Sequence, residues 1–332
     1  MGRQLTAGVV GLGWAAEEFH LPVYQENTNT KLVAIADIDS ERLQTVADGY
    51  GVPNRYRSAH DMFAETDLDV VSICTPPSTH EEIFVEAATN GCHIFCEKPV
   101  ATKSQSAQRM EEAADEAEII TQIGHTPRYY ENYQRMLNII DSGLLGDIES
   151  VTTTYIDDPP GIDWYYDPDV AGGGVIRDRC PHMFDMYLDI FDATPAVTGC
   201  RTRPKAHSPV EERAAIELEF GDTPVDITVE WNENSLSQTT ILGTNGWVEV
   251  NHIYLQGSIN GTDFEFKRGS LPVIDLEVEQ LFAGRFEDPH RKRIHDFIDH
   301  VVREDSETQV PISKAVTITQ LIDDIYQFED YQ

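Results

Sequence analysis

The sequence predicts a two-domain protein, in which a doubly wound parallel α/β sheet is followed by an α+β domain built on an antiparallel sheet. Its 332 residues are about twice the usual length of a single domain. Up to residue 124, short apolar runs alternate with helix-like segments, the pattern of βαβ units. Beyond residue 125, extended segments separated by turn signals predominate. We therefore expect domains at 1–124 and 125–332.

The first domain is expected to contain five strands. They are Leu5–Val10, Lys31–Ala36, Val70–Cys74, His93–Cys96 and Ile119–Ile123. Helix start signals stand between them at Ser40, at Ser78 or Thr79, and at Ser104, and the first two of these helices end at Gly51 and Gly91. Right-handed crossovers would join the five strands into a parallel sheet.

The second domain is expected to be mainly extended, with fewer helices. The extended segments are Ile148–Ile156, Ala196–Arg203, Ala214–Phe220, Asp226–Trp231, Thr239–Leu242, Trp247–Val250 and Phe264–Lys267. Turn signals such as Gly221-Asp222 and Asn245-Gly246 favour antiparallel pairing between them. Helical segments are expected at Tyr130–Ser142, Cys180–Phe191, Pro289–Arg303 and Lys314–Phe328.

The charge of the chain is unusual. Fifty-eight acidic residues against 24 basic ones give a formal net charge of −34, and there are only seven lysines. Such a charge argues against nucleic acid as a partner. The acids are spread along the chain, which favours a halophilic protein whose self-repulsion is screened by molar salt. An acidic enzyme from an ordinary environment is the alternative.

The sequence also indicates where the protein works. It contains no apolar run long enough to cross a bilayer, and its N-terminus enters a strand without a cleavable apolar segment. The five cysteines form no CxxC pair, which argues against a disulfide framework. We expect a cytoplasmic protein without a membrane partner. No metal site is expected, because Cys92 and Cys96 would point to the opposite side of a strand from His93.

A glycine motif follows the first strand. Gly11, Gly13 and Ala16 form GxGxxA between a strand and a helix, where glycines let the backbone approach a pyrophosphate. Asp37 ends the second strand, close to the spacing expected for an acid that binds the adenosine ribose. It favours NAD over NADP, although Arg42 nearby leaves NADP possible. The alternative is that Asp37 or Asp39 caps the next helix.

Two further loops follow the expected strands Val70–Cys74 and His93–Cys96. Cys74-Thr75-Pro76-Pro77-Ser78-Thr79-His80 is the first, and Cys96-Glu97-Lys98-Pro99 is the second. Ligands of open α/β sheets bind beyond the carboxyl ends of the strands, so both loops are candidates. Lys98 stands out because the chain contains few lysines. A solvated lysine in a turn is the alternative.

Five segments together resemble one known family. GVVGLGWAAEEFHLP, ICTPPSTH, GCHIFCEKPVA, the segment 124–129 and GGGVIRDRCPH are similar, in the same order, to signatures of the glucose-fructose oxidoreductase/inositol dehydrogenase (Gfo/Idh/MocA) family. The resemblance implies a Rossmann domain followed by a domain with a large, mostly antiparallel open sheet that commonly makes oligomer contacts. It also implies a nicotinamide cofactor and a sugar, polyol or related substrate.

The resemblance implies that Lys98, Asp178 and His182 are the catalytic residues. In a helix, positions 178 and 182 lie on one face, where a carboxylate can orient an imidazole. His182 is expected to be the general base and Lys98 to stabilise the developing alkoxide, although the lysine is an alternative proton carrier. Arg179 and Cys180 depart from the family pattern, which bears on substrate shape.

The remaining site residues are expected around these positions. Those expected to bind the cofactor are Gly11, Leu12, Gly13, Trp14, Ala15, Ala16, Asp37, Ile38, Arg42, Cys74, Thr75, Pro76, Pro77, His80, Glu97, Lys98 and Arg128. Those expected to bind the substrate are Lys98, Tyr155, Asp157, Trp164, Arg177, Asp178 and His182.

The expected function is hydride transfer between NAD, or NADP, and a secondary hydroxyl of a sugar, sugar derivative or cyclic polyol. The expected assembly is a homodimer or homotetramer formed through the sheet of the second domain. Two other functions occur among relatives of this kind. One is a redox-neutral, NAD-dependent glycosidase, and the other is a non-enzymatic NAD(P)-sensing regulator. The catalytic residues Lys98, Asp178 and His182 favour the dehydrogenase.

Overall fold

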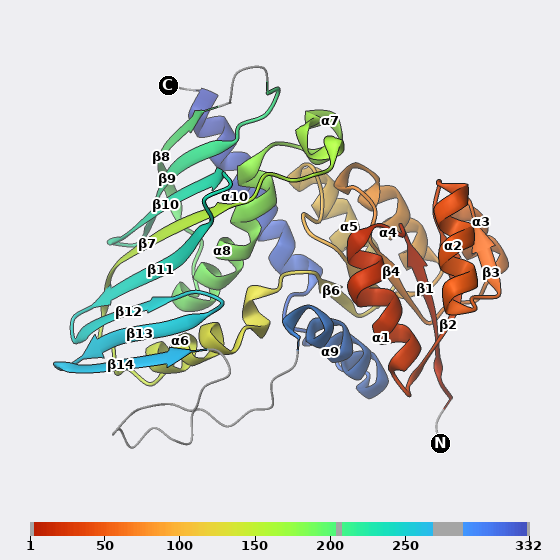
Figure 1. Ribbon diagram of the computed structural model, residues 1–332, viewed down its shortest axis with the longest axis horizontal. Coiled ribbons are helices and arrows are strands. Elements are labelled where there is room, and N and C mark those ends of the chain that lie inside the picture. Colours follow the sequence, from red (N-terminus) through yellow and green to blue (C-terminus); the bar gives the residue numbers. More distant parts are fainter. Residues whose placement is uncertain (1–2, 204–207, 268–287, 331–332) are drawn as a thin grey trace. The chain divides into compact units, whose positions relative to one another are not determined.

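The computed structural model describes residues 3–203, 208–267 and 288–330 (Figure 1). The chain divides into two compact units. Unit 1 comprises Met1–His125, Asp169–Gly172 and Asp288–Thr319, and unit 2 comprises Thr126–Pro168, Gly173–Glu287 and Gln320–Gln332. The sequence-based division at residue 124 differs from this in one main respect. Residues 288–319 belong to the first unit, because their apolar side chains are buried in its two cores.

Unit 1 is built on a six-stranded sheet in the order β3-β2-β1-β4-β5-β6, in which every pair is parallel. The strands are β1 (Leu5–Val10), β2 (Thr30–Ala36), β3 (Asn54–Tyr56), β4 (Val70–Ile73), β5 (His93–Cys96) and β6 (Thr121–Ile123). This confirms the doubly wound sheet. The sequence did not reveal β3, whose three polar or aromatic residues form no apolar run and pair only with β2.

Helices cover both faces of this sheet. They are η1, a π-helix (Ala16–His20), α1 (Leu21–Glu26), α2 (Ser40–Tyr50), α3 (Ala59–Glu65), the 3₁₀ turn η2 (Pro77–Thr79), α4 (His80–Thr89), α5 (Ser104–Glu116) and α9 (Pro289–Arg303). Residues of α3, α4 and α5 share one core with the start of α10 (Ile312–Asp330). Residues of η1, α1, α2 and α9 share the other. Helix α9 joins unit 1 because Ile294, Phe297 and Ile298 are fully buried there.

The ends of α2 show how local sequence sets an element. Its N-cap is Asp39, whose carboxylate accepts hydrogen bonds from the backbone N–H groups of Glu41 and Arg42. Ser40, the expected start signal, is the first helical residue. The helix ends, as expected, at Gly51, which has φ of 65° and so adopts a left-handed conformation that favours glycine.

Unit 2 is built on an eight-stranded sheet in the order β14-β13-β12-β11-β7-β10-β9-β8. The strands are β7 (Ile148–Asp157), β8 (Ala196–Arg203), β9 (Arg213–Phe220), β10 (Thr223–Trp231), β11 (Leu236–Gly243), β12 (Gly246–Val250), β13 (Tyr254–Ile259) and β14 (Thr262–Lys267). Only β7 and β10 pair in parallel, so the sheet is mostly antiparallel, as expected. The sequence did not reveal β13, in which Gly257 interrupts the apolar alternation.

One face of this sheet is covered and the other is open. Along β9, buried and exposed residues alternate strictly. Helices α6 (Glu131–Asp141) and α8 (Val175–Phe191) lie on the covered face (Figure 1), and no helix of the described residues covers the opposite face. Short helices α7 (Pro168–Ala171), η3 (Pro127–Tyr129) and η4 (Asp163–Tyr166) complete the described elements.

Helix α8 begins five residues earlier than expected. The sequence predicted a helical run from Cys180, and proline is unfavourable inside a helix. In the structure the helix starts at Val175 and includes Pro181 within it. Asp178 therefore lies in its first turn, where a carboxylate interacts favourably with the helix dipole.

Candidate active site: a nucleotide loop in unit 1 and a polar helix face in unit 2

The turn after β1 requires a glycine at its first position. Gly11 has φ of +83°, and a Cβ atom there would lie 2.8 Å from the backbone of both Cys74 and Thr75. Gly13, in contrast, faces open space, with nothing within 4 Å of a Cβ built on it. Ala16 is fully buried at the start of η1. The loop therefore leaves its backbone accessible for a close-approaching pyrophosphate.

The carboxylate of Asp37 lies beside this loop. Its Oδ2 accepts a hydrogen bond from the backbone N–H of Leu12 at 2.7 Å, and its Oδ1 accepts one from the N–H of Asp39 at 2.8 Å. The cap of the following helix is Asp39, so Asp37 does not have that role. A carboxylate held at the end of β2 next to the glycine loop fits the ribose of NAD.

Two large apolar side chains are exposed close to this loop in the sequence. Ile38 is 81% exposed and Trp14 is 65% exposed, with the indole of Trp14 packed edge-on against Phe19. Ala15 and Arg42 are the other expected cofactor contacts here. Ala15 packs against the buried core, and the backbone of Arg42 is engaged by the Asp39 cap. Exposed apolar side chains beside a nucleotide loop are available to cover a bound base.

The loops after β4 and β5 are joined by His80. This buried imidazole lies with Nε2 2.7 Å from the carbonyl oxygen of Thr75 and Nδ1 3.1 Å from that of Val100. Burial lowers its pKa, so the ring is neutral at pH 7. Among the expected cofactor contacts of this loop, Cys74, Thr75 and Pro76 are partly exposed, whereas Pro77 and His80 are buried. We therefore assign His80 to the alignment of the two loops.

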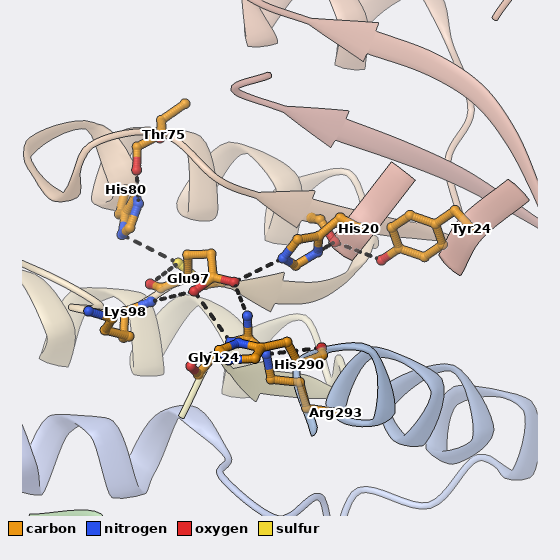
Figure 2. A network of polar contacts seen from close by, with 11 residues as sticks. His20, Tyr24, Thr75, His80, Glu97, Lys98, Gly124, His290 and Arg293 are labelled. Atoms are coloured by element: carbon orange, nitrogen blue, oxygen red, sulfur yellow. Dashed lines mark hydrogen bonds and ion pairs between the residues drawn. The ribbon is translucent and has the colours of Figure 1, made fainter. Parts of the chain in front are cut away.

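Lys98 follows β5 and is partly exposed. The preceding Glu97 is buried, and its carboxylate is in contact with His20 and Arg293 (Figure 2). The peptide bond between Lys98 and Pro99 is cis. The expected catalytic lysine thus follows a residue, Glu97, whose side chain is held by a buried polar network.

In unit 2, α8 carries Asp178 and His182 one helical turn apart. Asp178 is buried, and its Oδ2 accepts a hydrogen bond from Trp231 Nε1 at 3.2 Å. His182 is partly exposed. Because residues four apart lie on the same side of a helix, the two side chains share one face, as the spacing predicted.

Arg179 adds a cation that the sequence had marked only as a departure from the family pattern. Its guanidinium lies 3.1 Å from Oδ2 of Asp178 and 3.1 Å from Oδ2 of Asp157, at the end of β7. It also lies over the ring of Tyr155, 5.8 Å from the centroid. Asp157, Tyr155 and Asp178 were expected to bind substrate, and Arg179 brings these three together.

Aromatic rings gather on the same part of unit 2. Trp164 and Tyr165 stack with their centroids 3.8 Å apart, and Tyr166 packs edge-on against Trp231 at 5.4 Å. Trp164 thus has one ring face covered by Tyr165. At that ring face the segment therefore packs on itself and does not offer a platform to a substrate.

Two of the expected site residues are instead held in buried ion pairs. Arg177 is 3% exposed and its guanidinium lies 2.6 Å from Asp323. Arg128 forms an ion pair with Asp185 at 2.6 Å, and a second with Asp189. These contacts fix α8 to its neighbours. We therefore leave Arg177 out of the substrate site and Arg128 out of the cofactor site proposed below.

Glu211 is a residue that the sequence did not reveal. Its carboxylate accepts hydrogen bonds from the backbone N–H groups of Gly174 and Ile176, and so caps the start of α8. The hydroxyl of Tyr326 donates to it at 2.8 Å. A Cβ on Gly174 would lie 2.0 Å from the backbone carbonyl oxygen of Glu211, which explains the glycine. No short-range signal links residues so far apart in the chain.

The expected catalytic residues belong to different units. Lys98 lies in unit 1, whereas Asp178 and His182 lie in unit 2. None of the five cysteines, all of which lie in the described residues, forms a disulfide. The residues described include no group of three histidine, cysteine, aspartate or glutamate side chains arranged to hold a metal ion. Within the same residues, no helix has the length and apolar character needed to cross a bilayer.

Comparison with known families agrees with this architecture. Residues 5–125 match the oxidoreductase family with an NAD-binding Rossmann fold, and residues 133–249 match the GFO/IDH/MocA C-terminal domain. The chain belongs to the Gfo/Idh/MocA oxidoreductase family. The expected cofactor, NAD, is confirmed by the NAD-binding domain of this family. The expected class, a dehydrogenase, is likewise confirmed at the level of the family.

Two named proteins of known sequence are similar to this Gfo/Idh/MocA chain. Oxidoreductase P35 of Formosa agariphila is 24% identical over 260 residues, 74% of this chain and 79% of that protein. Myo-inositol 2-dehydrogenase of Thermotoga maritima is 28% identical over 180 residues, 54% of this chain and 52% of that enzyme. The chain therefore spans about half the length of the inositol dehydrogenase that it matches.

A solved structure shows the same fold over the whole chain. Levoglucosan dehydrogenase in complex with NADH and levoglucosan superposes with a TM-score of 0.84 over 99% of this chain and 98% of that one, at 20% sequence identity. At this identity the similarity establishes the fold of the chain. It does not identify the substrate.

Proposed function

We propose that this protein is an NAD-dependent dehydrogenase that transfers a hydride between nicotinamide and a secondary hydroxyl of a sugar, sugar derivative or cyclic polyol. Bound NAD supplies a hydride acceptor at its nicotinamide ring. His182 takes the hydroxyl proton, with Asp178 on the same helix face to orient it. Lys98 donates a hydrogen bond to the substrate oxygen and stabilises its developing negative charge.

The observation that carries this proposal is where the three expected catalytic side chains lie on their own secondary-structure elements. Lys98 leaves the carboxyl end of β5, the edge at which open parallel sheets bind their ligands. Asp178 and His182 share one face of α8. A regulator that only senses NAD has no need for a lysine, a carboxylate and an imidazole in these positions, so their retention favours catalysis.

The proposed cofactor site uses the glycine loop and the ends of β2, β4 and β5. Asp37 accepts hydrogen bonds from the adenosine ribose and repels a 2′-phosphate, which makes NAD the preferred cofactor. Its partners in the proposal are Gly11, Leu12, Gly13, Trp14, Ala15, Ala16, Ile38, Arg42, Cys74, Thr75, Pro76, Pro77, Glu97 and Lys98. His80 supports them by joining two of the loops.

The proposed substrate class rests on unit 2 and on the relatives. One matching relative is named an inositol dehydrogenase, and the structurally similar enzyme binds levoglucosan. In this chain Asp157, Arg179 and Asp178 form a chain of charged groups beside Tyr155 and the Trp164 segment. Carboxylates and guanidinium groups offer the acceptors and donors that a polyhydroxylated ring requires.

We also propose that copies of the chain associate through the open face of the unit 2 sheet. Leu236, Leu242 and Trp247 are exposed there, at 46%, 42% and 37%. Glu249 on the same face is surrounded by neutral donors, since the side chains of Gln238, Thr240, Tyr254 and Gln256 all donate to it. A sheet face with exposed apolar side chains and a satisfied carboxylate suits a dimer or tetramer contact.

The proposed environment is a cytoplasm with molar salt. The net charge of −34 supports the high salt, because screening at that concentration removes the self-repulsion of the folded chain. Five cysteines that form no disulfide support a reducing compartment.

The decisive experiment is an assay of nicotinamide absorbance with a panel of sugars, inositols, sugar acids and nucleotide sugars in molar KCl, with NAD and NADP in turn. A substrate-dependent signal that disappears in Lys98→Ala supports the proposal. The variant should keep its affinity for NAD within about tenfold, because the glycine loop supplies most of the binding. Unchanged turnover in this variant contradicts the role of Lys98.

The two other functions give different results. A redox-neutral glycosidase would release product from a glycoside while showing no net change in nicotinamide absorbance. A regulator would bind NAD by calorimetry without any turnover in the panel. Product analysis of each reaction by chromatography therefore accompanies the absorbance measurement.

A further inference from the structure

The residue before Lys98, Glu97, forms a buried ion pair. The carboxylate of Glu97 is 9% exposed, and its Oε1 lies 2.6 Å from Nη2 of Arg293 and 2.9 Å from Nε2 of His20 (Figure 2). Burial by itself raises the pKa of Glu97, but Arg293 and His20 outweigh it and hold the pKa well below its usual value. Glu97 is therefore ionised at neutral pH.

Arg293 comes from α9, almost two hundred residues further along the chain. It is 2% exposed, and its Nη1 donates to the carbonyl oxygen of Gly124 at 2.5 Å. Its Nε donates to the carbonyl oxygen of His290 at 3.2 Å, and the guanidinium lies 5.4 Å from the centroid of Phe95. Arg293 thus links the turn after β5 to the turn after β6.

The packing around this contact is tight. A Cβ on Gly124 would lie 2.6 Å from Oε2 of Glu97 and would also collide with the guanidinium of Arg293. Glycine at position 124 is therefore required by the approach of these two side chains. The first residue of the segment 124–129, which contributed to the family resemblance, is explained by this contact.

The network also includes a neutral branch. Nδ1 of His20 lies 2.8 Å from the hydroxyl of Ser72, which in turn lies 2.8 Å from the hydroxyl of Tyr24. Burial is the main cause that lowers the pKa of His20, so its ring is neutral at pH 7. Of the two side chains that contact Oε1 of Glu97, His20 and Arg293, only Arg293 is therefore positively charged. The π-helical turn η1 ends at His20 and presents it to Glu97.

Glu97 is connected to the catalytic lysine through the backbone. Its Oε2 accepts a hydrogen bond from the backbone N–H of Lys98 at 3.3 Å. Arg293 donates to both oxygens of this carboxylate, to Oε1 from Nη2 and to Oε2 from Nη1 at 3.4 Å, and Oε2 is thus shared between Arg293 and the peptide that carries the Lys98 side chain. A shift of this carboxylate would be transmitted to the lysine directly.

We propose that Arg293 is a positioning residue, which acts through Glu97 to fix the backbone from which Lys98 reaches the substrate. The inference rests on the proposed function, since that function makes Lys98 catalytic. A buried ion pair contributes little net stability compared with apolar side chains of similar volume. Its geometry, with both carboxylate oxygens and three guanidinium nitrogens engaged, is instead suited to holding a turn in one conformation.

The test compares Arg293→Met, Arg293→Lys and the double variant Glu97→Gln/Arg293→Met with a matched control. Arg291→Met is that control, because Arg291 lies on the same helix in a more exposed ion pair with Glu26. Arg293→Met alone leaves the carboxylate of Glu97 buried without its cation, which can impair folding. The double variant has no such charge, so it tests the position of Lys98 even where Arg293→Met folds poorly. Thermal unfolding by circular dichroism identifies the variants that fold.

The first readout is turnover. Arg293→Met should lower kcat about 10- to 100-fold, the loss typical of a misplaced catalytic group, while the Kd for NAD changes less than threefold. Arg293→Lys, which keeps the charge but not the planar fork, should fall between Arg293→Met and the wild type. Arg291→Met should match the wild type. A double variant with wild-type kcat would overturn the proposal, since it would show that Arg293 only neutralises Glu97.

The second readout is the pH profile. Titratable groups that face Glu97 are His20 from η1, His290 and Arg293 from α9, His80 from α4, and Cys74 and Cys96 from the strand ends. In Arg293→Met the buried carboxylate loses its cation, its pKa rises, and kcat should fall as pH is lowered through that value. The double variant should lack this limb and still be slow. A purely structural role would give no new limb.

The third readout does not depend on turnover. Reductive methylation with ¹³C labels the seven lysines, and the Lys98 signal is assigned with Lys98→Arg. Arg293→Met and the double variant should move this signal, whereas Arg291→Met should not. An unmoved Lys98 signal in both would overturn the proposal. If the wild type shows no dehydrogenase activity, the proposed function fails and this readout still decides the role of Arg293.

Discussion

The indole nitrogen of Trp231 donates a hydrogen bond to the carboxylate of Asp178, with Nε1 and Oδ2 3.2 Å apart. Trp231 is fully buried at the end of β10, and Asp178 is buried in the first turn of α8. The sheet thus fixes the orientation of the acid that we propose to orient His182. Because the donor and the acceptor are both buried, loss of the donor leaves the carboxylate oxygen with fewer partners.

Trp231→Phe should therefore reduce kcat about tenfold and lower the free energy of unfolding by about 2–3 kcal/mol, because a hydrogen bond to a buried carboxylate is lost and the smaller ring leaves space in a fully buried site. The Kd for NAD should not change. Steady-state kinetics and urea unfolding measure the two effects. Trp247→Phe, on the open face of the sheet, is the control for loss of an indole. Wild-type kcat in Trp231→Phe would show that this bond does not orient the catalytic acid.

Asp37 should determine the choice between NAD and NADP. Asp37→Asn removes the charge that repels a 2′-phosphate, so the ratio of the two dissociation constants should move at least tenfold toward NADP. Isothermal titration with each cofactor measures this ratio. Asp39→Asn changes the net charge equally but alters only the cap of α2, and it should leave the ratio within twofold. Equal shifts in both variants would indicate a general charge effect.

Glu211 should make the stability of unit 2 depend on pH. Burial raises the pKa of its carboxyl group above the usual value, and hydrogen bonds from Tyr326 and the backbone offset this only in part. The folded state therefore binds this proton more tightly than the unfolded state. The resulting stability is complete below the unfolded-state pKa and is lost as pH rises through the folded-state value.

Glu211→Gln cannot ionise, so its free energy of unfolding should lack this decrease. The free energy of unfolding of the wild type minus that of the variant should therefore decrease as pH rises from about 4 to 8. Urea unfolding in molar KCl at several pH values measures it. Glu219→Gln, at an exposed position on β9, is the control and should keep the wild-type pH dependence. A constant difference for Glu211→Gln would disprove the assignment.

The net charge should make stability rise with salt. Between 0.1 and 3 M KCl the Debye length falls from about 10 Å to about 3 Å or less, so repulsion among the acidic side chains is progressively screened. The midpoint of thermal unfolding should increase steadily over this range, and activity should be highest above 1 M. A midpoint that is flat or falls above 0.5 M would identify an acidic enzyme of ordinary environments instead.

The open sheet face should control assembly. Trp247→Glu places a charge opposite Leu242, its cross-strand neighbour, and should dissociate the oligomer into smaller species. Light scattering coupled to size-exclusion chromatography measures the mass. Ile253→Glu is the matched control, because Ile253 is 53% exposed but lies in the turn before β13. An assembly that tolerates Trp247→Glu would place the contact elsewhere.

The sequence was most informative where its signals are local. A glycine motif directly after a strand, a left-handed glycine at the end of α2 and the periodicity of α9 each depend on a few neighbouring residues. These signals predicted the glycine turn after β1 and the start and end of α9, and the structure has all three at those positions. They failed for β3 and β13, which are strands because a neighbouring strand pairs with them.

The fold class, the family, the glycine loop after β1 and the candidates Lys98, Asp178 and His182 could be predicted from the sequence, because each is encoded in contiguous residues. The side chains that support these residues became evident only from the folded structure. Arg293 reaches Glu97, Trp231 reaches Asp178 and Glu211 caps α8 across distances along the chain that no periodicity or motif spans. The structure also showed Arg128 and Arg177 in buried ion pairs. The physical reason is that burial and ion pairing depend on the packed neighbours of a residue, which its sequence neighbours do not specify.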